Sequence, residues 1–505
     1  MNPGLAGTHS NFGYEVLDRD IERTSERTAL VTNDRRWTYG EVARLSNQAG
    51  NALRATGIEL EDRVVLALND RIETIAMMIG ALKIGAVVVP VSPWLSQEEY
   101  AYLIDDSRCR AVIATVDAAQ QIRPLVQGRP WPLLIVADGP EATEPGLSEF
   151  IAAGSAVLEI APTKGDDAAM WHYTSGSTGR PKAVIHTHAQ LNALDGYPPD
   201  RLDLREDDVV MCVAKLFVAY GAGLLAVAFF EGASYCLIDG RPSPMVVAGA
   251  VQQLRPTLFA GVPANFAGML AVPMLDFGSV RSCISAGDRL SRGLFDTWRS
   301  RTGLEMINLL ASTETYAPFL ASRIGSGDPE RMDVVPGYDI QLVDESGLPV
   351  VGEAAGDLLV KGPTVFNRYW LNDRLTQATV MGEWVRTGDR CVRHADGTVE
   401  YVGRGNEMFK SGGQWVDPVK VEAALNQHPA VLESGVVGRP DSSGVVVPMA
   451  FVVLRPGETE QAVLDAREHL AGRLLPHELP RSLIVVATLP KTAGGKIRRF
   501  LLGAN

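Results

Sequence analysis

Short apolar runs alternate with helical patterns in the first part of the chain, and this alternation limits the folds that it can adopt. The predicted elements are, in order, Val64–Asn69, Ile72–Ile84, Ala86–Val91, Gln97–Asp106 and Ala111–Thr115. Strands and helices in this order are typical of βαβ units, which form a parallel sheet whose faces are covered by helices. The same alternation returns from Asp208 to about Cys283. The sequence therefore predicts an α/β fold.

Other regions have different patterns. Leu17–Thr56 predicts helices around a short hairpin at Ala29–Thr38. Gly128–Thr163 is rich in Pro, Gly and Glu, which favours a surface connection. Asp339–Gly405 predicts short strands joined by Gly, Asp and Asn turns, as in an antiparallel barrel or sheet.

The end of the chain again mixes helices and strands. The elements predicted there are Val419–Gln427, Val431–Gly438, Met449–Leu454, Ala462–Leu475 and Ser482–Val486. We place a domain boundary at Arg404–Asn406, where the strand-rich region ends.

Composition excludes several classes of protein. The chain has 505 residues, which corresponds to about three domains at a typical domain size. It carries 47 Lys and Arg against 60 Asp and Glu, a net charge of −13, which disfavours binding to nucleic acid or to an anionic membrane surface. An apolar fraction of 46% with 21% charged residues is ordinary for a globular protein and excludes a disordered or fibrous chain.

The cysteines and the apolar stretches indicate a cytoplasmic protein. The cysteines are Cys109, Cys212, Cys236, Cys283 and Cys391. Their number is odd and no CxxC pair occurs, so we expect buried thiols rather than disulfides or a zinc site. Met1–Asn11 lacks a basic start followed by an apolar run, and no apolar stretch is long enough to span a bilayer.

Tyr173–Lys182 reads YTSGSTGRPK and follows an apolar run at Ala168–Trp171. Its glycines permit close backbone approach, while backbone N–H groups and hydroxyls can donate to an anion. The segment therefore predicts a phosphate-binding loop, although the GxxxxGK[ST] pattern of the P-loop is absent. By composition alone it could also be a flexible Ser/Gly loop.

Four other strings each suit nucleotide chemistry weakly by themselves. Thr beside a carboxylate suits a phosphate and Mg²⁺, Asp in a Gly turn suits ribose, and a Lys in a Gly-Gly turn can enter a site. Helix caps and ordinary solvated turns have the same compositions. The strings are ASTE at Ala311–Glu314, RTGDR at Arg386–Arg390, GRGNEMFK at Gly403–Lys410 and KTAGGKIR at Lys491–Arg498.

Taken together and in this order, the strings resemble the adenylate-forming superfamily of acyl-CoA synthetases, luciferases and peptide-synthetase adenylation domains. The resemblance covers Phe12 to about Phe500 and is closest to the benzoate-CoA ligase group. The segments that carry this closer likeness are YLIDDS at Tyr102–Ser107, KLFVAYG at Lys215–Gly221, STETYAPFLASR at Ser312–Arg323 and VPGYDIQLVDESG at Val335–Gly347.

The resemblance implies an α/β architecture in two domains. A large N-terminal domain, residues 1–405, would contain two α/β subdomains and a distorted β-barrel. A small mobile α+β domain, residues 406–505, would carry the catalytic lysine. The implied substrates and cofactors are an aromatic carboxylic acid, ATP, Mg²⁺ and coenzyme A, in a monomer or homodimer.

The resemblance also assigns residues to ATP. Thr313 would touch the α-phosphate, Glu314 would bind Mg²⁺, Asp389 would bind ribose, and Arg404 would hold ribose and phosphate. The phosphate loop would consist of Thr174, Ser175, Gly176, Ser177, Thr178, Gly179 and Lys182. The walls around adenine would be Ala286–Asp288, which includes Gly287, and Asn308–Leu310.

The implied reaction has two steps. The acid attacks the α-phosphorus of ATP while Lys496 offsets the developing charge, and pyrophosphate leaves an acyl-AMP. The small domain then rotates about a hinge at Asn406, and a thiol attacks the acyl-AMP. Lys410–Gln414, with Lys410, Ser411, Gly412 and Gly413, would line the thiol tunnel. The hinge is usually Asp or Lys in the family, so Asn406 can alter the balance of the two conformers.

Two further departures lie near the nucleotide. Ala183 stands where the family usually has Gly, a change that we expect to be harmless. Leu309 and Leu310 replace the family's Gly and aromatic residue at the adenine wall, so adenine would be held by backbone and apolar packing.

The residues that match the acyl pocket favour a bulky aryl acid. Val218 replaces both the Asp that binds an α-amine in peptide synthetases and the Phe of the benzoate group. Ala317 and Pro318 replace His-Ile of that group. These trimmed positions predict room for a substituted benzoate or a naphthoate, although Ala311 in place of Gly narrows one side. The alternative is that neighbouring side chains refill the space and the substrate is benzoate. The remaining lining would be Phe217, Ala219, Tyr220 and Ala286.

Several alternatives stay open at this stage. An aryl-acid ligase that loads an acyl carrier protein is the strongest. GAGLLA at Gly221–Ala226 satisfies a dinucleotide fingerprint, but that motif has a high false-positive rate. A non-catalytic relative would be expected to lose Lys496, Glu314 or Asp389, and all three are present. His172, His186 and His188 are interpreted as packed residues rather than metal ligands or bases.

Overall fold

The computed structural model describes residues 10–128, 130–137, 146–175, 180–273, 275–405, 408–411, 414–441, 445–459, 461–471, 473–491 and 497–503. The chain forms two compact units. Unit 1 consists of residues 1–174, 181–340 and 360–385, and unit 2 of residues 175–180, 341–359 and 386–505. The boundary at Arg404–Asn406 stays a prediction.

The first sheet of unit 1 has the strand order β18-β8-β7-β4-β3-β5-β6. Its strands are β3 Arg63–Ala67, β4 Val87–Pro90, β5 Ala111–Ala114, β6 Leu133–Val136, β7 Ala168–Ser175, β8 Pro181–Thr187 and β18 Arg368–Tyr369. The pairs β3–β4, β3–β5, β5–β6 and β4–β7 are parallel, as the alternating pattern predicts. Apolar residues of α5, Gln97–Ser107, and α6, Val116–Val126, pack on this sheet.

One prediction was wrong in this region. Gly128–Thr163 was expected to be a surface connection, but it contains β6 and the helix α7, Leu147–Ala152. β6 is the edge strand and pairs in parallel with β5. A four-residue strand is too short to show a period, and the Pro- and Gly-rich residues around it conceal its apolar run.

The second sheet of unit 1 has the strand order β15-β14-β13-β12-β11-β9-β10-β1-β2. Its strands are β1 Thr28–Val31, β2 Arg36–Thr38, β9 Val209–Cys212, β10 Ser234–Cys236, β11 Leu258–Gly261, β12 Ser282–Ser285, β13 Met306–Leu310, β14 Leu320–Ser322 and β15 Met332–Val334. The strands from β1 to β13 along this order are parallel. The β1–β2 pair confirms the hairpin expected near the start of the chain.

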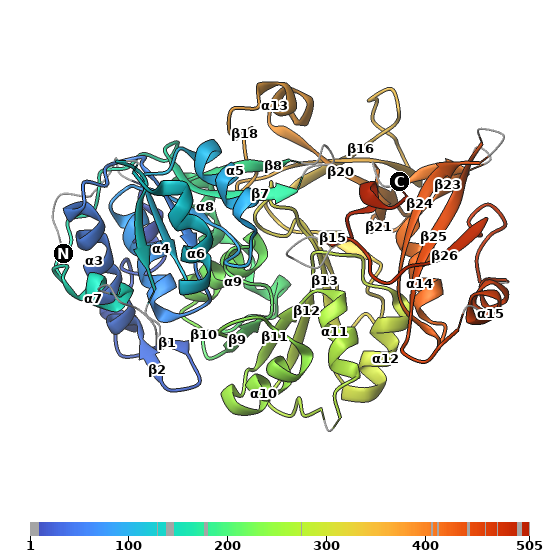
Figure 1. Ribbon diagram of the computed structural model, residues 1–505, viewed down its shortest axis with the longest axis horizontal. Helices are drawn as coiled ribbons and strands as arrows, with labels where there is room; N and C mark the ends of the chain where they lie inside the picture. Colours follow the sequence, from blue (N-terminus) through green and yellow to red (C-terminus); the bar gives the residue numbers. More distant parts are fainter. Residues whose placement is uncertain are drawn as a thin grey trace. The chain divides into compact units, whose positions relative to one another are not determined.

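Helices α10 Pro244–Leu254, α11 Pro263–Leu270 and α12 Arg292–Thr302 cover one face of this sheet with a shared apolar core (Figure 1). Besides these and α5, α6 and α7, unit 1 contains α1 Phe12–Glu15, α2 Ile21–Thr24, α3 Tyr39–Ala55, α4 Ile72–Lys83, α8 His188–Asn192, α9 Ala219–Phe230 and α13 Asp373–Thr379, with 3₁₀ turns at Ala193–Gly196 and Pro199–Arg201.

Unit 2 holds most of the short strands and mixed elements that the sequence predicts after Asp339, while β19 lies in unit 1. Strands β24, β25 and β26 form a sheet on which α14 and α15 pack, and β22 and β23 form a hairpin. The elements from Asp339 onward are β16 Asp339–Val343, β17 Ala354–Lys361, β19 Val380–Met381, β20 Trp384–Arg393, β21 Val399–Arg404, β22 Phe409–Ser411, β23 Gln414–Val416, α14 Pro418–Asn426, β24 Val431–Pro440, β25 Val446–Leu454, α15 Gln461–Leu470, β26 Ser482–Val485 and a 3₁₀ turn at Arg499–Leu501.

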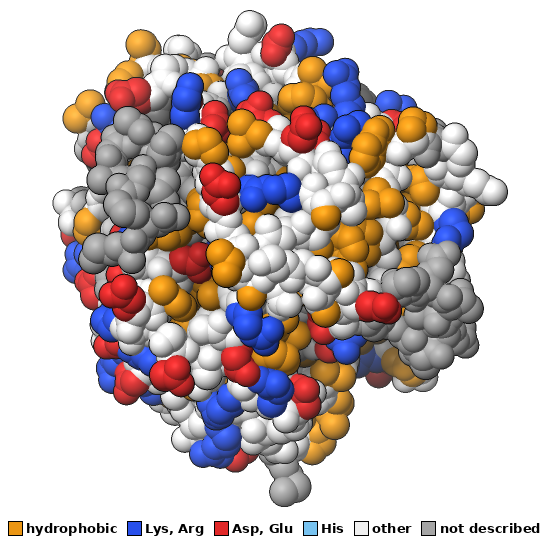
Figure 2. All heavy atoms as spheres, turned by 90° about the vertical axis from the view of Figure 1, so that its left-hand side faces the viewer, with side chains coloured by type: hydrophobic (Ala, Val, Ile, Leu, Met, Phe, Trp, Pro, Cys, Tyr) orange, Lys and Arg blue, Asp and Glu red, His pale blue; other side chains and the backbone are white. Residues whose placement is uncertain are grey.

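Cysteines and surface charge follow the composition. All five cysteines are free and buried. Basic and acidic side chains are interspersed on the face drawn in Figure 2, which gives that face no continuous basic stripe. In the part of the chain that the structure describes, every helix is too short or too polar to cross a bilayer.

Helices α3 and α4 approach each other closely at two glycines. A Cβ atom on Gly80 would lie 2.5 Å from the carbonyl oxygen of Ser46 and 2.7 Å from the nitrogen of Gly50. A Cβ on Gly50 would lie 2.8 Å from the carbonyl oxygen of Gly80. Both obstacles are backbone atoms, so this helix crossing requires glycine on each side.

We predict that Gly80→Ala destabilises the protein, because backbone must move to admit the methyl group. Overpacking of this kind costs about 1–3 kcal/mol in the free energy of unfolding. The matched control is Gly249→Ala in α10, where an added Cβ meets nothing within 4 Å. That variant gains about 0.5–1 kcal/mol from helix propensity. Urea unfolding of both variants measures the difference, and equal stabilities would contradict this account of the crossing.

Candidate functional site

Four parallel strands of unit 1 end at one edge of the second sheet. β9, β11, β12 and β13 are neighbours in parallel register, so the loops after them meet at the carboxyl edge. In open α/β sheets this edge is where ligands bind. The loops carry the predicted acyl-pocket and nucleotide residues that follow Cys212, Ser285 and Leu310. The topology therefore gathers, in unit 1, residues that are nearly a hundred positions apart in the sequence.

Lys182 and Glu314 form an ion pair at this edge. The Nζ atom of Lys182 donates to Oε1 of Glu314 over 3.1 Å. The hydroxyl of Tyr369 contacts both groups, 2.8 Å from Lys182 Nζ and 2.8 Å from Glu314 Oε1. The ammonium also lies 4.2 Å from the centroid of the Tyr369 ring, a cation–π distance. Lys182 stands at the start of β8 and Glu314 follows β13, so the pair joins the two sheets of unit 1.

The turn that presents Thr313 and Glu314 is held by backbone hydrogen bonds from two other segments. Imidazole Nε2 of His186 donates to the carbonyl oxygen of Thr313 over 2.8 Å. The backbone N–H of Phe366 donates to the carbonyl oxygen of Glu314 over 2.8 Å. The hydroxyl of Thr364 donates to the carbonyl oxygen of the next residue, Thr315. Other segments of the protein therefore donate hydrogen bonds to the backbone carbonyls of this turn, which fixes the direction of the side chains of Thr313 and Glu314.

Tyr316, the residue after this turn, has a left-handed backbone with φ of +60°. A bulky residue in that region costs about 1–3 kcal/mol and persists only where its surroundings hold it. Its ring contacts His172 and His186 edge-to-face, at centroid distances of 5.5 and 4.8 Å. Its hydroxyl donates to Sδ of Met170 over 3.2 Å. The buried ring thus compensates for the strained backbone beside Glu314.

The buried histidines His172, His186 and His188 are neutral. Burial lowers the pKa of His172 to about 3, and the pKa values of His186 and His188 to about 4. A neutral imidazole that donates from Nε2 must have its proton there, which assigns the tautomer of His186. His188 accepts the backbone N–H of Phe12 at Nδ1 over 2.9 Å. These contacts agree with a packing role.

The loop that carries Phe217 and Val218 is anchored by a buried ion pair. Lys215 Nζ lies 3.5 Å from a carboxylate oxygen of Asp70, whose other oxygen accepts the backbone N–H of Leu216 over 3.2 Å. Burial raises the pKa of Asp70 to about 6. Phe217 packs edge-to-face on Trp94 at a centroid distance of 5.8 Å. The anchor fixes the start of α9 at the carboxyl edge.

The other predicted acyl-pocket residues lie on the loops at this edge or in the first turn of α9. Val218 is 38% exposed although it is apolar, while Ala317 and Ala286 are buried. The hydroxyl of Tyr220 donates to the carbonyl oxygen of Ile284 over 3.4 Å. The assignment of Ala219, Ala311 and Pro318 to the acyl pocket stays a prediction.

Structural contacts hold the residues that are predicted around adenine. Asn308 Nδ2 donates to the carbonyl oxygen of Pro329 over 2.8 Å, so this amide holds a neighbouring loop. Gly287 has φ of +84°, which favours glycine, and Asp288 beside it is exposed. Thr174 is the last residue but one of the strand β7, next to the predicted phosphate loop.

Unit 2 contains the remaining described candidates. Asp389 on β20 is opposite Arg404 on β21 in the strand register, and Arg404 Nε lies 3.1 Å from Oδ1 of Asp389. Arg404 also donates to the carbonyl oxygen of Thr387 over 2.8 Å. Lys410 Nζ donates to Glu345 over 2.9 Å, and Ser411 is buried. Their assignment to ribose, phosphate and the thiol tunnel stays a prediction.

Several predicted site residues lie outside the described residues. Lys496, the predicted catalytic lysine, is among them, between Lys491 and Ile497, which pair as an antiparallel bridge. The side chain of Ser175 is likewise not described. The others are Gly176, Ser177, Thr178 and Gly179 of the loop, the hinge Asn406, and Gly412 and Gly413.

Sequence reasoning missed Tyr369 and interpreted Gly221–Ala226 ambiguously. Tyr369 belongs to none of the motifs identified in the sequence. The signal that could have indicated it is a polar aromatic residue in a strand of only two residues. Gly221 and Gly223 lie inside α9 rather than in a strand-to-helix turn. A Cβ on Gly221 would lie 2.5 Å from the carbonyl oxygens of Ala214 and Lys215. These glycines serve packing, which removes the structural context that a dinucleotide fingerprint needs.

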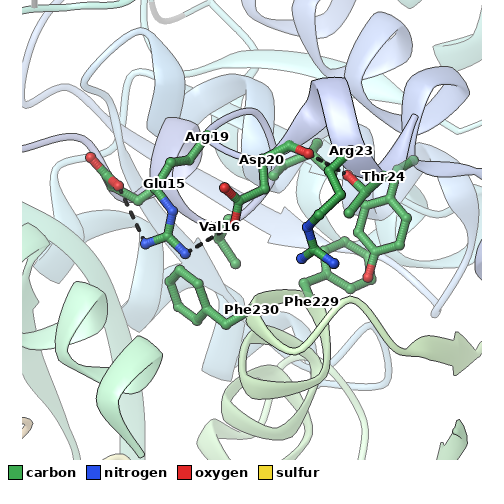
Figure 3. Close-up of a pocket in the computed structure, with 10 residues that line it drawn as sticks. Glu15, Val16, Arg19, Asp20, Arg23, Thr24, Phe229 and Phe230 are labelled. Carbon is green, nitrogen blue, oxygen red and sulfur yellow. Dashed lines mark hydrogen bonds and ion pairs between the residues drawn. The ribbon is translucent and has the colours of Figure 1, made fainter. Parts of the chain in front are cut away.

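A separate pocket lies between α1, α2 and the end of α9 (Figure 3). Arg19 dominates it and is paired with Asp195 at 2.7 Å, Asp20 at 3.3 Å and Glu15 at 3.8 Å. Phe230 lies at the opposite end of α9 from Val218, about 16 Å along a helix of 12 residues. Arg19 in this pocket is paired with nearby carboxylates, and the pocket lies at the other end of α9. The pocket is therefore distinct from the site at the carboxyl edge.

Comparisons with known proteins agree with this geometry. Residues 17–370 match the family described as AMP-binding enzyme, and residues 420–496 match the AMP-binding enzyme C-terminal domain. The chain is 37% identical to a benzoate–CoA ligase of Thauera aromatica, over 94% of this chain and 92% of that one. It is 34% identical to a 4-hydroxybenzoate–CoA/benzoate–CoA ligase of Rhodopseudomonas palustris, over 97% and 93%.

Solved structures give the same result. An anthranilate CoA ligase in complex with anthranoyl-AMP superposes with a TM-score of 0.91 at 32% identity, covering 99% of this chain and 98% of the other. A benzoate CoA ligase from Burkholderia xenovorans superposes with a TM-score of 0.87 at 36% identity, covering 97% and 99%. The fold predicted from the sequence is therefore confirmed.

We predict that His186→Gln flattens the acid dependence of stability. The folded pKa of His186 is about 4, below the unfolded value of about 6.5, so its contribution to stability is complete above pH 6.5 and falls as the pH drops toward 4. Gln keeps the donor to Thr313. Between pH 7 and pH 5 the wild type should lose about 2 kcal/mol more than the variant. Urea unfolding at both pH values measures this, and parallel curves would mean that His186 is charged in the folded protein.

Proposed function

This chain belongs to the AMP-binding enzyme family, and we propose that it joins an aromatic carboxylic acid to the thiol of coenzyme A at the expense of ATP. It is an AMP-forming acid–CoA ligase, and the acid we assign to it is a substituted benzoate or a bicyclic acid such as a naphthoate. The observation that carries the proposal is the Lys182–Glu314 pair, placed at the carboxyl edge beside the acyl-pocket loops.

The first half-reaction activates the acid. Its carboxylate oxygen attacks the α-phosphorus of ATP, the bond to the β-phosphate oxygen breaks, and pyrophosphate leaves an acyl-AMP. Lys182 donates to the phosphate oxygens and so offsets negative charge, and the hydroxyl of Thr313 adds a donor. In the second half-reaction the thiol sulfur attacks the acyl carbon and AMP leaves with the electron pair of the broken C–O bond.

The residues present fit Mg²⁺. Among the described residues, no group of three or more His, Cys, Asp or Glu side chains could hold a metal by itself. Mg²⁺ is usually bound through one or two carboxylates together with substrate phosphates and water, which matches the single carboxylate of Glu314 beside Lys182. When bound, the ion neutralises charge on the phosphates. Glu314 is held ready by its backbone contact with Phe366.

The acyl side of the site supports an aromatic acid without a charged substituent. Val218 offers no carboxylate, so the ammonium of an amino acid would be buried without a partner. Val218 and Ala317 are smaller than the Phe and His that the resemblance gives the benzoate group at these positions, and Val218 keeps exposed apolar surface. Apolar surface of this kind favours a ring larger than benzoate. The relatives are named as CoA ligases of benzoate, 4-hydroxybenzoate and anthranilate. We therefore assign coenzyme A as the acceptor.

We predict ATP–pyrophosphate exchange with aryl acids and its loss in Lys496→Ala. The panel runs from benzoate through hydroxy-, amino- and methoxybenzoates to naphthoates, cinnamates, fatty acids and amino acids. Removal of the lysine should lower exchange by about a hundredfold or more, because a charge-stabilising donor is lost. Best exchange with benzoate would keep the mechanism and refute the enlarged pocket. No exchange with any acid would refute the function, and thioester formation with coenzyme A tests the acceptor.

We predict that Ala317→His narrows the acid specificity. A buried imidazole at this position fills space next to the acyl loops, so kcat/KM for naphthoate should fall about tenfold or more relative to benzoate. Benzoate in the same variant is the internal control for folding. An unchanged ratio of the two values of kcat/KM would contradict the assignment of Ala317 to the acyl pocket.

A further inference from the structure

Tyr369 contacts the Lys182–Glu314 ion pair but belongs to none of the motifs identified in the sequence. It stands on β18, which pairs antiparallel with β8, so that Tyr369 is opposite Val184, two residues beyond Lys182. Its side chain is buried, and its hydroxyl lies 2.8 Å from Lys182 Nζ and 2.8 Å from Glu314 Oε1. One phenol hydroxyl thus bridges the cation and the anion that the site brings together.

The segment that carries Tyr369 is tied to the Thr313–Glu314 turn at several points. Thr364 and Phe366 donate to the carbonyl oxygens of Thr315 and Glu314. The ring of Phe366 packs edge-to-face on the ring of Tyr369 at a centroid distance of 4.7 Å. The backbone N–H of Tyr369 donates to the hydroxyl of Thr376 over 3.1 Å. The hydroxyl of Tyr369 is therefore fixed relative to Glu314 by backbone, not only by its own contact.

We propose that Tyr369 is a positioning residue for nucleotide binding. The proposal rests on the proposed function, in which Lys182 meets phosphate and Glu314 meets Mg²⁺. Lys182 and Glu314 contact each other directly at 3.1 Å. When the polyphosphate enters, the ammonium has to turn toward it and the carboxylate loses that partner. Tyr369 holds a hydrogen bond to each group from a rigid segment, so both remain at the separation that a metal-bound polyphosphate needs.

If the Tyr369 hydroxyl acted in packing alone, its removal would lower the stability of the protein without a separate effect on nucleotide binding. The phenol has one donor and can accept, so it can donate to the carboxylate while accepting from the ammonium. Hydrogen bonds to charged groups are about twice as strong as neutral ones. Their loss should therefore appear where those charges act, in the binding of ATP with Mg²⁺, and not in the affinity for the aryl acid.

The test is Tyr369→Phe in the full-length chain, with Tyr338→Phe as the matched control. Phe keeps the ring, and with it the packing on Phe366 and the cation–π contact. The control removes another buried tyrosine hydroxyl, which lies 2.6 Å from the hydroxyl of Thr364 in the same tied segment but is bonded to neither Lys182 nor Glu314. Thermal unfolding compares the stabilities of the two variants. Calorimetric titration with ATP at several Mg²⁺ concentrations, without any acid, measures nucleotide binding.

We expect Tyr369→Phe to weaken ATP binding about ten- to a hundredfold at limiting Mg²⁺ and to raise the Mg²⁺ concentration for half-maximal binding. The KM for the acid should stay within about twofold. Tyr338→Phe should bind ATP as the wild type does, at a similar loss of melting temperature. Wild-type binding by Tyr369→Phe, or equal weakening in both variants, would overturn the proposal. If the wild type binds ATP with Mg²⁺ but no aryl acid supports exchange, the acid assignment fails while the role of Tyr369 stands; no ATP binding by the wild type would overturn both.

Discussion

The parallel hydrogen-bond ladder of β9, β11, β12 and β13 is the constraint on which the rest of unit 1 depends. Parallel strands need crossover helices, so every connection returns to the amino edge and every following loop leaves at the carboxyl edge. Chemistry-bearing loops accumulate there without any local signal that they are neighbours. The apolar core under α10, α11 and α12 keeps that edge in place, because its strands are buried between layers.

The second requirement is a connection between the two sheets of unit 1. Lys182 begins a strand of one sheet and Glu314 follows a strand of the other, and the segment from Thr364 to Tyr369 binds both. Hydrogen bonds to backbone carbonyls supply most of this connection. The side chains of Thr313 and Glu314 can therefore face a ligand while their own backbone is satisfied by the protein, as buried polar groups require.

Periodicity and turn residues predicted the parallel sheets, the hairpin near the start and the mixed elements at the end of the chain, because those signals are local. The ordered strings near Tyr173, Ala311, Arg386 and Lys491 predicted the family. β6 escaped because four apolar residues carry no period. Tyr369 escaped because its partners are 187 and 55 positions away, and only the folded topology makes them neighbours. Asn308 was assigned to adenine, but no sequence pattern shows that its amide also holds Pro329.

The left-handed backbone of Tyr316 has a consequence for protein engineering. Stabilisation by sequence design favours Gly or Asn wherever φ is positive, since these residues relieve the backbone. At this position such a replacement removes the ring that separates two uncharged imidazoles and the hydroxyl that reaches Met170. Such a replacement would lower the backbone energy at position 316 but would leave an opening under the Thr313–Glu314 turn. Position 316 is thus one where optimising thermal tolerance and preserving turnover select different amino acids.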